Sequence, residues 1–157
     1  METKSLVKTC DGIRVSSVLN RDTKQYGRKF LYDGNPDTCW NSDKGKVQWI
    51  KLLFDDPLEI HVLKNLSLHL QFQGGFCSRH CEITAVNENG TKVGIANCYP
   101  EDVNKEQTFA LSFNVDENLV CSPHGISELK ISFEELTDFF GRVTLYLIDI
   151  LVQIDQS

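Results

Sequence analysis

The segment from Leu66 to Phe72 alternates strictly between apolar and polar side chains. Its apolar residues stand at every second position, and Ser67, His69 and Gln71 separate them. Successive side chains of a β-strand point to opposite faces, so this alternation is the period of a strand with one buried face. We therefore expect a strand over residues 60–72, with the leucines and Phe72 on its buried side.

Most of the other periodic segments also have the composition of strands, and a short turn over 27–31 is the best helix candidate. The Asn89-Gly90 pair between two of these segments is a strong hairpin signal. Many short strands joined by Gly, Pro and Asn turns favour an all-β fold, an antiparallel β-sandwich whose end loops carry binding sites. The further predicted strands cover 47–54, which stops at Asp55-Asp-Pro57, and 82–86, 92–96, 108–113, 128–133 and 142–154.

The composition limits the classes of function. A length of 157 residues fits one domain over 1–157, and the net charge of -6 disfavours direct binding to nucleic acid. Neither an apolar signal core nor a membrane-length apolar segment is present, so we expect an intracellular protein that does not enter the membrane. The six cysteines are then expected to be reduced, most of them as small buried apolar groups.

The loop 31–43 combines turn residues, oxygen donors and a large aromatic side chain. The oxygens of Asp33, Asn35 and Thr38 are close enough in sequence to turn toward a common centre, because a glycine and a proline bend the chain between them. Such a loop suits either a hard cation or a turn that caps itself. Trp40 can pin the loop to a core.

Asp33-Gly-Asn-Pro-Asp-Thr-Cys-Trp40 resembles the Asp-Gly-x-x-x-Thr-x-Trp signature of discoidin-like domains, in the galactose-binding-like superfamily that includes the coagulation-factor C-type domains. The resemblance implies a single discoidin-like jelly-roll antiparallel β-sandwich. It also implies a structural calcium site, in which Asp149 is shorter than the usual glutamate of the last strand. The alternative is that Asp33 and Thr38 only cap turns. The implied calcium ligands are Asp33, Asn35, Thr38, Asp149 and a main-chain oxygen near Phe30.

Four motifs in order are similar to those of a small family of nuclear-receptor-associated proteins built of this one domain; they span 14–20, 38–43, 71–76 and 137–143. The family includes a protein that binds the orphan nuclear receptor called testicular receptor four, so the resemblance implies a partner of this kind. The resemblance implies a nuclear protein that represses receptor-driven transcription by protein contact and reduces receptor binding to DNA. No Leu-x-x-Leu-Leu helix supports such contact: Leu147-Ile-Asp-Ile-Leu151 comes close but lies in the last predicted strand, so the contact should use the folded surface.

Two loops are the candidates for partner contact, because they hold aromatic and arginine side chains, the types that dominate interface energies. An alternative is that Phe139 and Phe140 cover the end of the core and that Arg142 pairs with Asp138 or Glu135. The candidate residues are Gln73, Phe76 and Arg79 in the first loop and Phe139, Phe140 and Arg142 in the second.

No catalytic motif is present: the sequence has no Gly-x-Ser-x-Gly elbow, phosphate-cradling glycine loop or metalloprotease motif. Cys77-Ser-Arg-His-Cys81 and Cys121-Ser-Pro-His124 have the residue types of a zinc site but match no standard spacing. We therefore expect a non-enzymatic interaction module. A glycan-binding module and a scaffold subunit of an intracellular complex are the alternatives.

Overall fold

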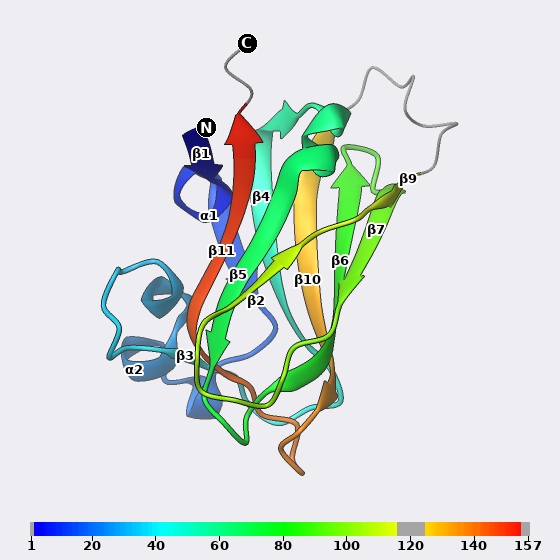
Figure 1. Cartoon of the computed structure of the whole chain (residues 1–157). Helices are drawn as coiled ribbons and strands as arrows, with labels where there is room; N and C mark the ends of the chain where they lie inside the picture. The colour runs from blue at the N-terminus through cyan, green and yellow to red at the C-terminus, as the bar shows by residue number, and fades with distance from the viewer. Residues whose placement is uncertain (1, 116–124, 155–157) are drawn as a thin grey trace.

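The computed structural model describes residues 2–115 and 125–154, which form two sheets packed face to face (Figure 1). Every strand pairing among these residues is antiparallel, so the predicted antiparallel β-sandwich is confirmed. One sheet has the order β1 (Glu2–Ser5), β11 (Thr144–Ile154), β5 (Leu66–Phe72), β8 (Gln107–Ala110), with β3 (Trp40–Asn41) also on β11. The other has the order β2 (Gly12–Val15), β4 (Gln48–Leu58), β10 (Ile126–Leu136), β6 (Ser78–Asn87), β7 (Lys92–Cys98), β9 (Asn114–Val115).

Short helical segments connect the strands. The turn predicted over 27–31 is a 3-10 helix, whereas α1 and α2 were not predicted, because four residues are too few to show a helical period. Each begins at a side-chain cap: the Ser5 hydroxyl accepts from Lys8 N, and the Asp22 carboxylate accepts from Gln25 N. The segments are α1 (Leu6–Thr9), η1 (Leu19–Arg21), α2 (Thr23–Tyr26), η2 (Arg28–Leu31) and η3 (Ile60–Asn65).

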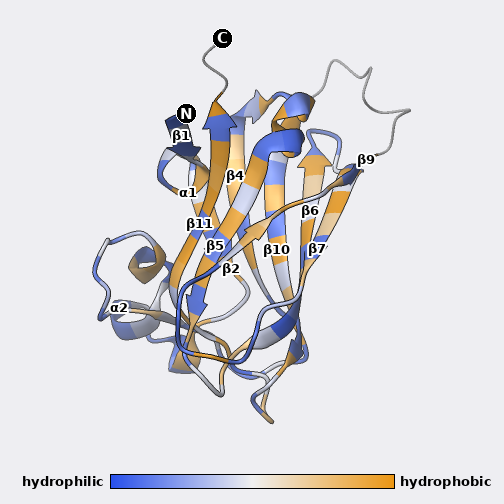
Figure 2. Ribbon diagram, in the orientation of Figure 1, coloured by the Kyte–Doolittle hydropathy of each residue, from blue (hydrophilic) through white to orange (hydrophobic). Residues whose placement is uncertain are grey.

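The core lies between the two sheets, where each strand directs its apolar side chains inward (Figure 2). The alternation in β5 is confirmed, since its leucines and Phe72 are at most 3% exposed. Phe133 of β10 connects the layers: its ring centroid lies 5.8 Å from that of Phe72 and 6.3 Å from that of Trp40. Trp40 is fully buried, as predicted, and so anchors the preceding loop.

Several predicted strand boundaries are wrong; the strand predicted over 108–113, for example, is β8 and ends at Ala110. Residues 60–65 form η3, in which Ile60 and Leu63 face the core at the three-residue spacing of a 3-10 helix. Strand β4 does not stop at Asp55-Asp-Pro57 but runs on to Leu58. A register shift in its pairing with β10 leaves this acidic, proline-containing stretch outside the regular ladder, and such irregularities tolerate proline.

The connection from β5 to β6 and the connection from β10 to β11 lie at the same end of the sandwich (Figure 1). The predicted hairpin joins β6 to β7 at the opposite end, with Gly90 at φ +79° and Asn87 Oδ1 accepting from the amides of Asn89 and Thr91. In the described part of the chain, no helix has the length and apolar character needed to cross a membrane. The loops that carry the predicted partner-binding residues therefore converge on one end.

Candidate functional site

The oxygens of the Asp33 loop are brought together, as predicted, and they bond to their own loop. Thr38 Oγ1 donates to Asp33 Oδ2 over 2.6 Å, and the Asn35 amide donates to Asp33 Oδ1 over 3.0 Å. The Asp37 amide donates to Asn35 Oδ1 over 2.9 Å. The bonds to the Asp33 carboxylate, from Thr38 first and then from the Asn35 amide, lower the pKa of Asp33 below its ordinary value. The geometry is that of a self-capped turn.

The other implied calcium ligands, Phe30 and Asp149, make contacts of their own. Phe30 belongs to η2, and its ring lies beneath the Lys29 ammonium, with 5.0 Å between the nitrogen and the ring centroid. Asp149 lies on β11 and accepts a 2.7 Å hydrogen bond from the Ser5 hydroxyl. Within 2–115 and 125–154, no group of three or more His, Cys, Asp or Glu side chains is arranged to hold a metal. The implied calcium site would draw most of its ligands from Asn, Thr and main-chain oxygens instead. The absence of a His, Cys, Asp and Glu cluster therefore does not test it, and calcium stays a prediction.

Calorimetric titration of chelator-treated protein tests the calcium prediction. We expect a heat of binding and a higher Tm on adding calcium, because an ion held only by the folded loop stabilises the fold. Asp33→Asn should remove both effects, since it removes the loop carboxylate that bonds to Thr38. No heat together with unchanged melting would contradict the calcium site and leave these oxygens as turn caps.

Arg142 joins the two loops predicted to contact a partner. Its guanidinium carbon lies 5.4 Å from the ring centroid of Phe76 in the first loop and 5.4 Å from that of Phe140 in the second. Cations at this distance from an aromatic ring are attracted to its π face. The two loops therefore form one surface rather than two separate ones.

Asp138 fixes the arginine in place. Its Oδ2 accepts from both the amide and Nε of Arg142 over 3.0 Å, and its Oδ1 accepts from Nη2 over 3.3 Å. Asp138 rather than Glu135 is thus the partner of Arg142. The pairing lowers the pKa of Asp138 below its ordinary value of 3.8. It therefore stabilises the loop above that pH, and its contribution is lost as the pH falls through the lower pKa of the folded state.

Phe139 and Phe140 project from the end of the sandwich. Their side chains are 92% and 59% exposed, and the rings meet edge to face with centroids 5.2 Å apart. They do not cover the core, so the alternative that assigned them that role is wrong. Exposed adjacent aromatics are unusual on a protein surface unless they meet a partner.

The remaining predicted contact residues have mixed surroundings. Gln73 Oε1 accepts from the Tyr146 hydroxyl over 3.2 Å, a bond that holds the loop to β11. Arg79 is exposed on β6. The pKa of Asp102 is lowered first by the Cys77 side chain, then by the Gly75 amide, and least by the charge of Arg79. Arg79 can meet a partner from this position, whereas Gln73 also has a role within the fold.

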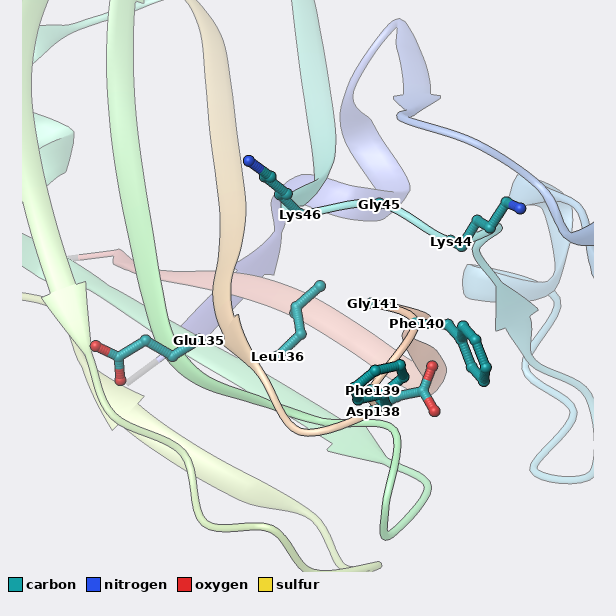
Figure 3. Close-up of a pocket in the computed structure, with 9 residues that line it drawn as sticks. All are labelled: Lys44, Gly45, Lys46, Glu135, Leu136, Asp138, Phe139, Phe140 and Gly141. Atoms are coloured by element: carbon teal, nitrogen blue, oxygen red, sulfur yellow. The ribbon is translucent and has the colours of Figure 1, made fainter.

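The sequence analysis missed Lys44, Lys46 and Tyr99. The lysines line a groove of about 490 Å³ together with Glu135, Leu136 and 138–141 (Figure 3). Tyr99 is 67% exposed, and its ring stacks on His80 with centroids 5.1 Å apart. No local pattern marks the lysines, because the groove exists only once a segment from about ninety residues later is folded against them.

The described cysteines are all free thiols. Cys81 on β6 faces Cys98 on β7, and the hydrogen bond with Cys98 and burial raise the pKa of Cys81. Burial raises the pKa of Cys77 to about 12. Cys77 and Cys81 therefore stay protonated, and protonated thiols are poor nucleophiles and poor metal ligands. The hydrogen bond with Cys81 lowers the pKa of Cys98, although burial opposes it. Cys77 and Cys81 belong to one of the two groups that have the residue types of a zinc site. The other group, Cys121 and His124, lies outside the described residues.

No family model matches the chain. The nuclear receptor 2C2-associated protein of Xenopus laevis is 47% identical over 88% of this chain and 90% of its own length. The protein of the same name from Danio rerio is 43% identical over 97% of this chain and 98% of its own.

Solved structures share the fold at low identity. An F5/8 type C domain from Bacteroides fragilis superposes with a TM-score of 0.61 and 15% identity over 91% of this chain and 92% of its own. Chitosan-binding module 1 of a Paenibacillus chitosanase/glucanase gives 0.63 and 14% over 94% and 98%. The predicted discoidin-like sandwich is therefore confirmed. Given the identity to full-length curated relatives, the chain belongs to the family of nuclear receptor 2C2-associated proteins.

Proposed function

We propose that this protein is a non-enzymatic interaction module that binds an orphan nuclear receptor and represses its transcriptional activity. Its relatives are named for association with nuclear receptor 2C2, and the structural neighbours are binding modules. A protein acting this way needs a preformed contact surface and no reactive group. The proposal also places the protein in the nucleus and gives it no direct contact with nucleic acid or membrane.

The exposed Phe139–Phe140 pair is the observation that carries the proposal. The pair stands on a loop whose Arg142 is held by three hydrogen bonds to Asp138 and stacks on Phe76. Aromatic and arginine side chains in a fixed arrangement lose little entropy on binding, which is the usual composition of an interaction hot spot.

The mechanism we propose is occlusion of the receptor. A protein of net charge -6 is electrostatically suited to cover a basic DNA-binding surface. Docking there would compete with DNA engagement or with receptor dimerisation. The protein's own carboxylates would then occupy the region that DNA phosphates would otherwise meet.

A DNA-binding titration tests occlusion. Purified nuclear receptor 2C2 is mixed with a labelled DNA site, and this protein is added until it saturates the receptor. We expect the Kd of the receptor for DNA to rise about tenfold or more, within the usual range of coupling between two ligands. Binding to the receptor with an unchanged DNA affinity would contradict occlusion, and no binding would contradict the receptor partner. In a separate experiment, purification of this protein from cells as part of a large stable complex would favour the role of a scaffold subunit.

A second candidate function is glycan binding, which the exposed Tyr99 favours. Its ring stacks on His80, whose Nε2 lies 2.7 Å from Asn97 Oδ1, so an aromatic face lies beside polar groups. Aromatic faces with adjacent polar groups suit a sugar ring. A glycan array tests this: binding that Tyr99→Ala abolishes would support it, and the absence of any bound sugar would contradict it.

A further inference from the structure

We infer that the groove beside Phe139 and Phe140 binds a segment of the partner protein in which an apolar side chain is flanked by carboxylates. The inference rests on the proposed function and adds to it one point of contact, an acidic segment of the partner that is separate from the basic DNA-binding surface that the acidic protein would cover. Three features carry it: the shape of the groove, its rigidity and the charge of its lining.

The groove has two walls that come from distant parts of the sequence (Figure 3). Lys44-Gly45-Lys46 forms one wall, the loop 138–141 forms the other, and Leu136 lies between them. Its volume of about 490 Å³ is within the range of sites that take small molecules or several side chains. It is open to solvent, which suits a peptide segment better than an enclosed small molecule.

The walls are fixed to each other before any partner arrives. The Gly45 amide donates to the Phe140 carbonyl over 3.0 Å. The buried Gln48 side chain donates through Nε2 to the Gly141 carbonyl over 3.1 Å and to the Asp43 carbonyl over 2.7 Å. Glu135 has φ +49°, a conformation that non-glycine residues rarely adopt and that recurs at binding sites. A preformed groove spares the ordering cost of binding.

The lining of the groove has a small cationic excess, although the protein as a whole is acidic. Lys44 and Lys46 are exposed, and neither takes part in the ion pairs of the described residues. The charge of Asp138 is already matched by Arg142. Figure 3 shows the Glu135 carboxylate and the Lys46 ammonium both directed away from the two phenylalanine rings. Among the residues that line the groove, the two lysines without an ion pair to another described residue outnumber the one such carboxylate, that of Glu135, so the lining has a small cationic excess that favours a carboxylate on the partner. Asp43, which acts on the charge of Arg142, is not part of the lining.

Two peptide probes test the inference on the full chain. One is a displayed library of random short peptides, and the other is an array of overlapping peptides that spans nuclear receptor 2C2. We expect the selected peptides to combine an aromatic or aliphatic residue with adjacent Asp or Glu. Binding should fall more than about tenfold in the Phe139→Ser/Phe140→Ser and Lys44→Glu/Lys46→Glu variants, since each removes one half of the recognition.

Matched controls separate the groove from general changes of charge or stickiness. Lys24→Glu/Lys92→Glu makes the same charge change at exposed lysines on α2 and β7, and Tyr32→Ser removes an exposed aromatic elsewhere. Both should bind as wild type does, and circular dichroism should show all variants folded. Selection of basic peptides, of none, or equal binding by all variants would overturn the inference. If library peptides bind as expected but the receptor does not, the groove stands and the proposed function fails.

Discussion

Trp40→Ala should destabilise the protein by about 3–5 kcal/mol, the usual cost of deleting a large buried aromatic side chain. Trp40 is fully buried and packs on Phe133, which in turn packs on Phe72 across the core. Its indole Nε1 also donates to the Ser17 carbonyl over 2.9 Å, so the substitution leaves a cavity and an unpaired acceptor. Urea titration should show the fall in stability, and Tm should drop on the order of 10 °C.

Trp49 provides the matched control. The chain has two tryptophans, and Trp49 is only half-buried on β4, beneath the ammonium groups of Lys51 and Lys130 at 4.7 and 5.6 Å. Trp49→Ala should cost less than about 2 kcal/mol, because it loses surface packing and weak cation–π attraction without opening a core cavity. Equal losses for the two variants would contradict the role of Trp40 as the anchor of the 31–43 loop.

Gly141→Ala should destabilise the protein by about 3 kcal/mol or more, the sum of a left-handed conformation and an overpacked contact. Gly141 has φ +79°, and a Cβ there would overlap the Gly45 carbonyl oxygen. One of the two groove walls must then move. Thermal unfolding should report the loss of stability, and receptor binding should weaken with it because Phe140 precedes the displaced residue.

Gly34→Ala separates the two causes. Gly34 has a similar φ of +72°, but no atom lies within 4 Å of the position that a Cβ would take. The substitution should therefore cost only the conformational part, about 1–2 kcal/mol. If Gly141→Ala were no more costly than Gly34→Ala, the close approach of the two groove walls would not be a constraint on the fold.

The strands could be predicted where the signal is local. The alternation in β5 is complete within seven residues, so its buried face follows from the sequence alone. The Asn89-Gly90 turn is equally local, because glycine readily adopts the positive φ that the hairpin needs. The end of β4 could not be predicted, since its continuation past Pro57 depends on the irregular pairing with β10.

The candidate surface was predicted only in part, for the same reason. The residue types in 137–142 indicate an interface, and the pairing of Arg142 with Asp138 is possible within one short loop. Whether Phe139 and Phe140 point inward or outward could not be read from their sequence, because an apolar residue in a turn suits either position. Packing of the finished sandwich decides it.

By itself, the sequence determined the all-β class, the discoidin-like loop with its buried tryptophan, and the segments that form the inner strands, because these depend on neighbours along the chain. The tertiary structure alone decided that Phe76, Arg142 and Phe140 form one surface and that Lys44 and Lys46 line a groove beside it. These contacts join segments that are far apart in sequence. Their positions depend on strand order and register, which are set by the packing of the two whole sheets.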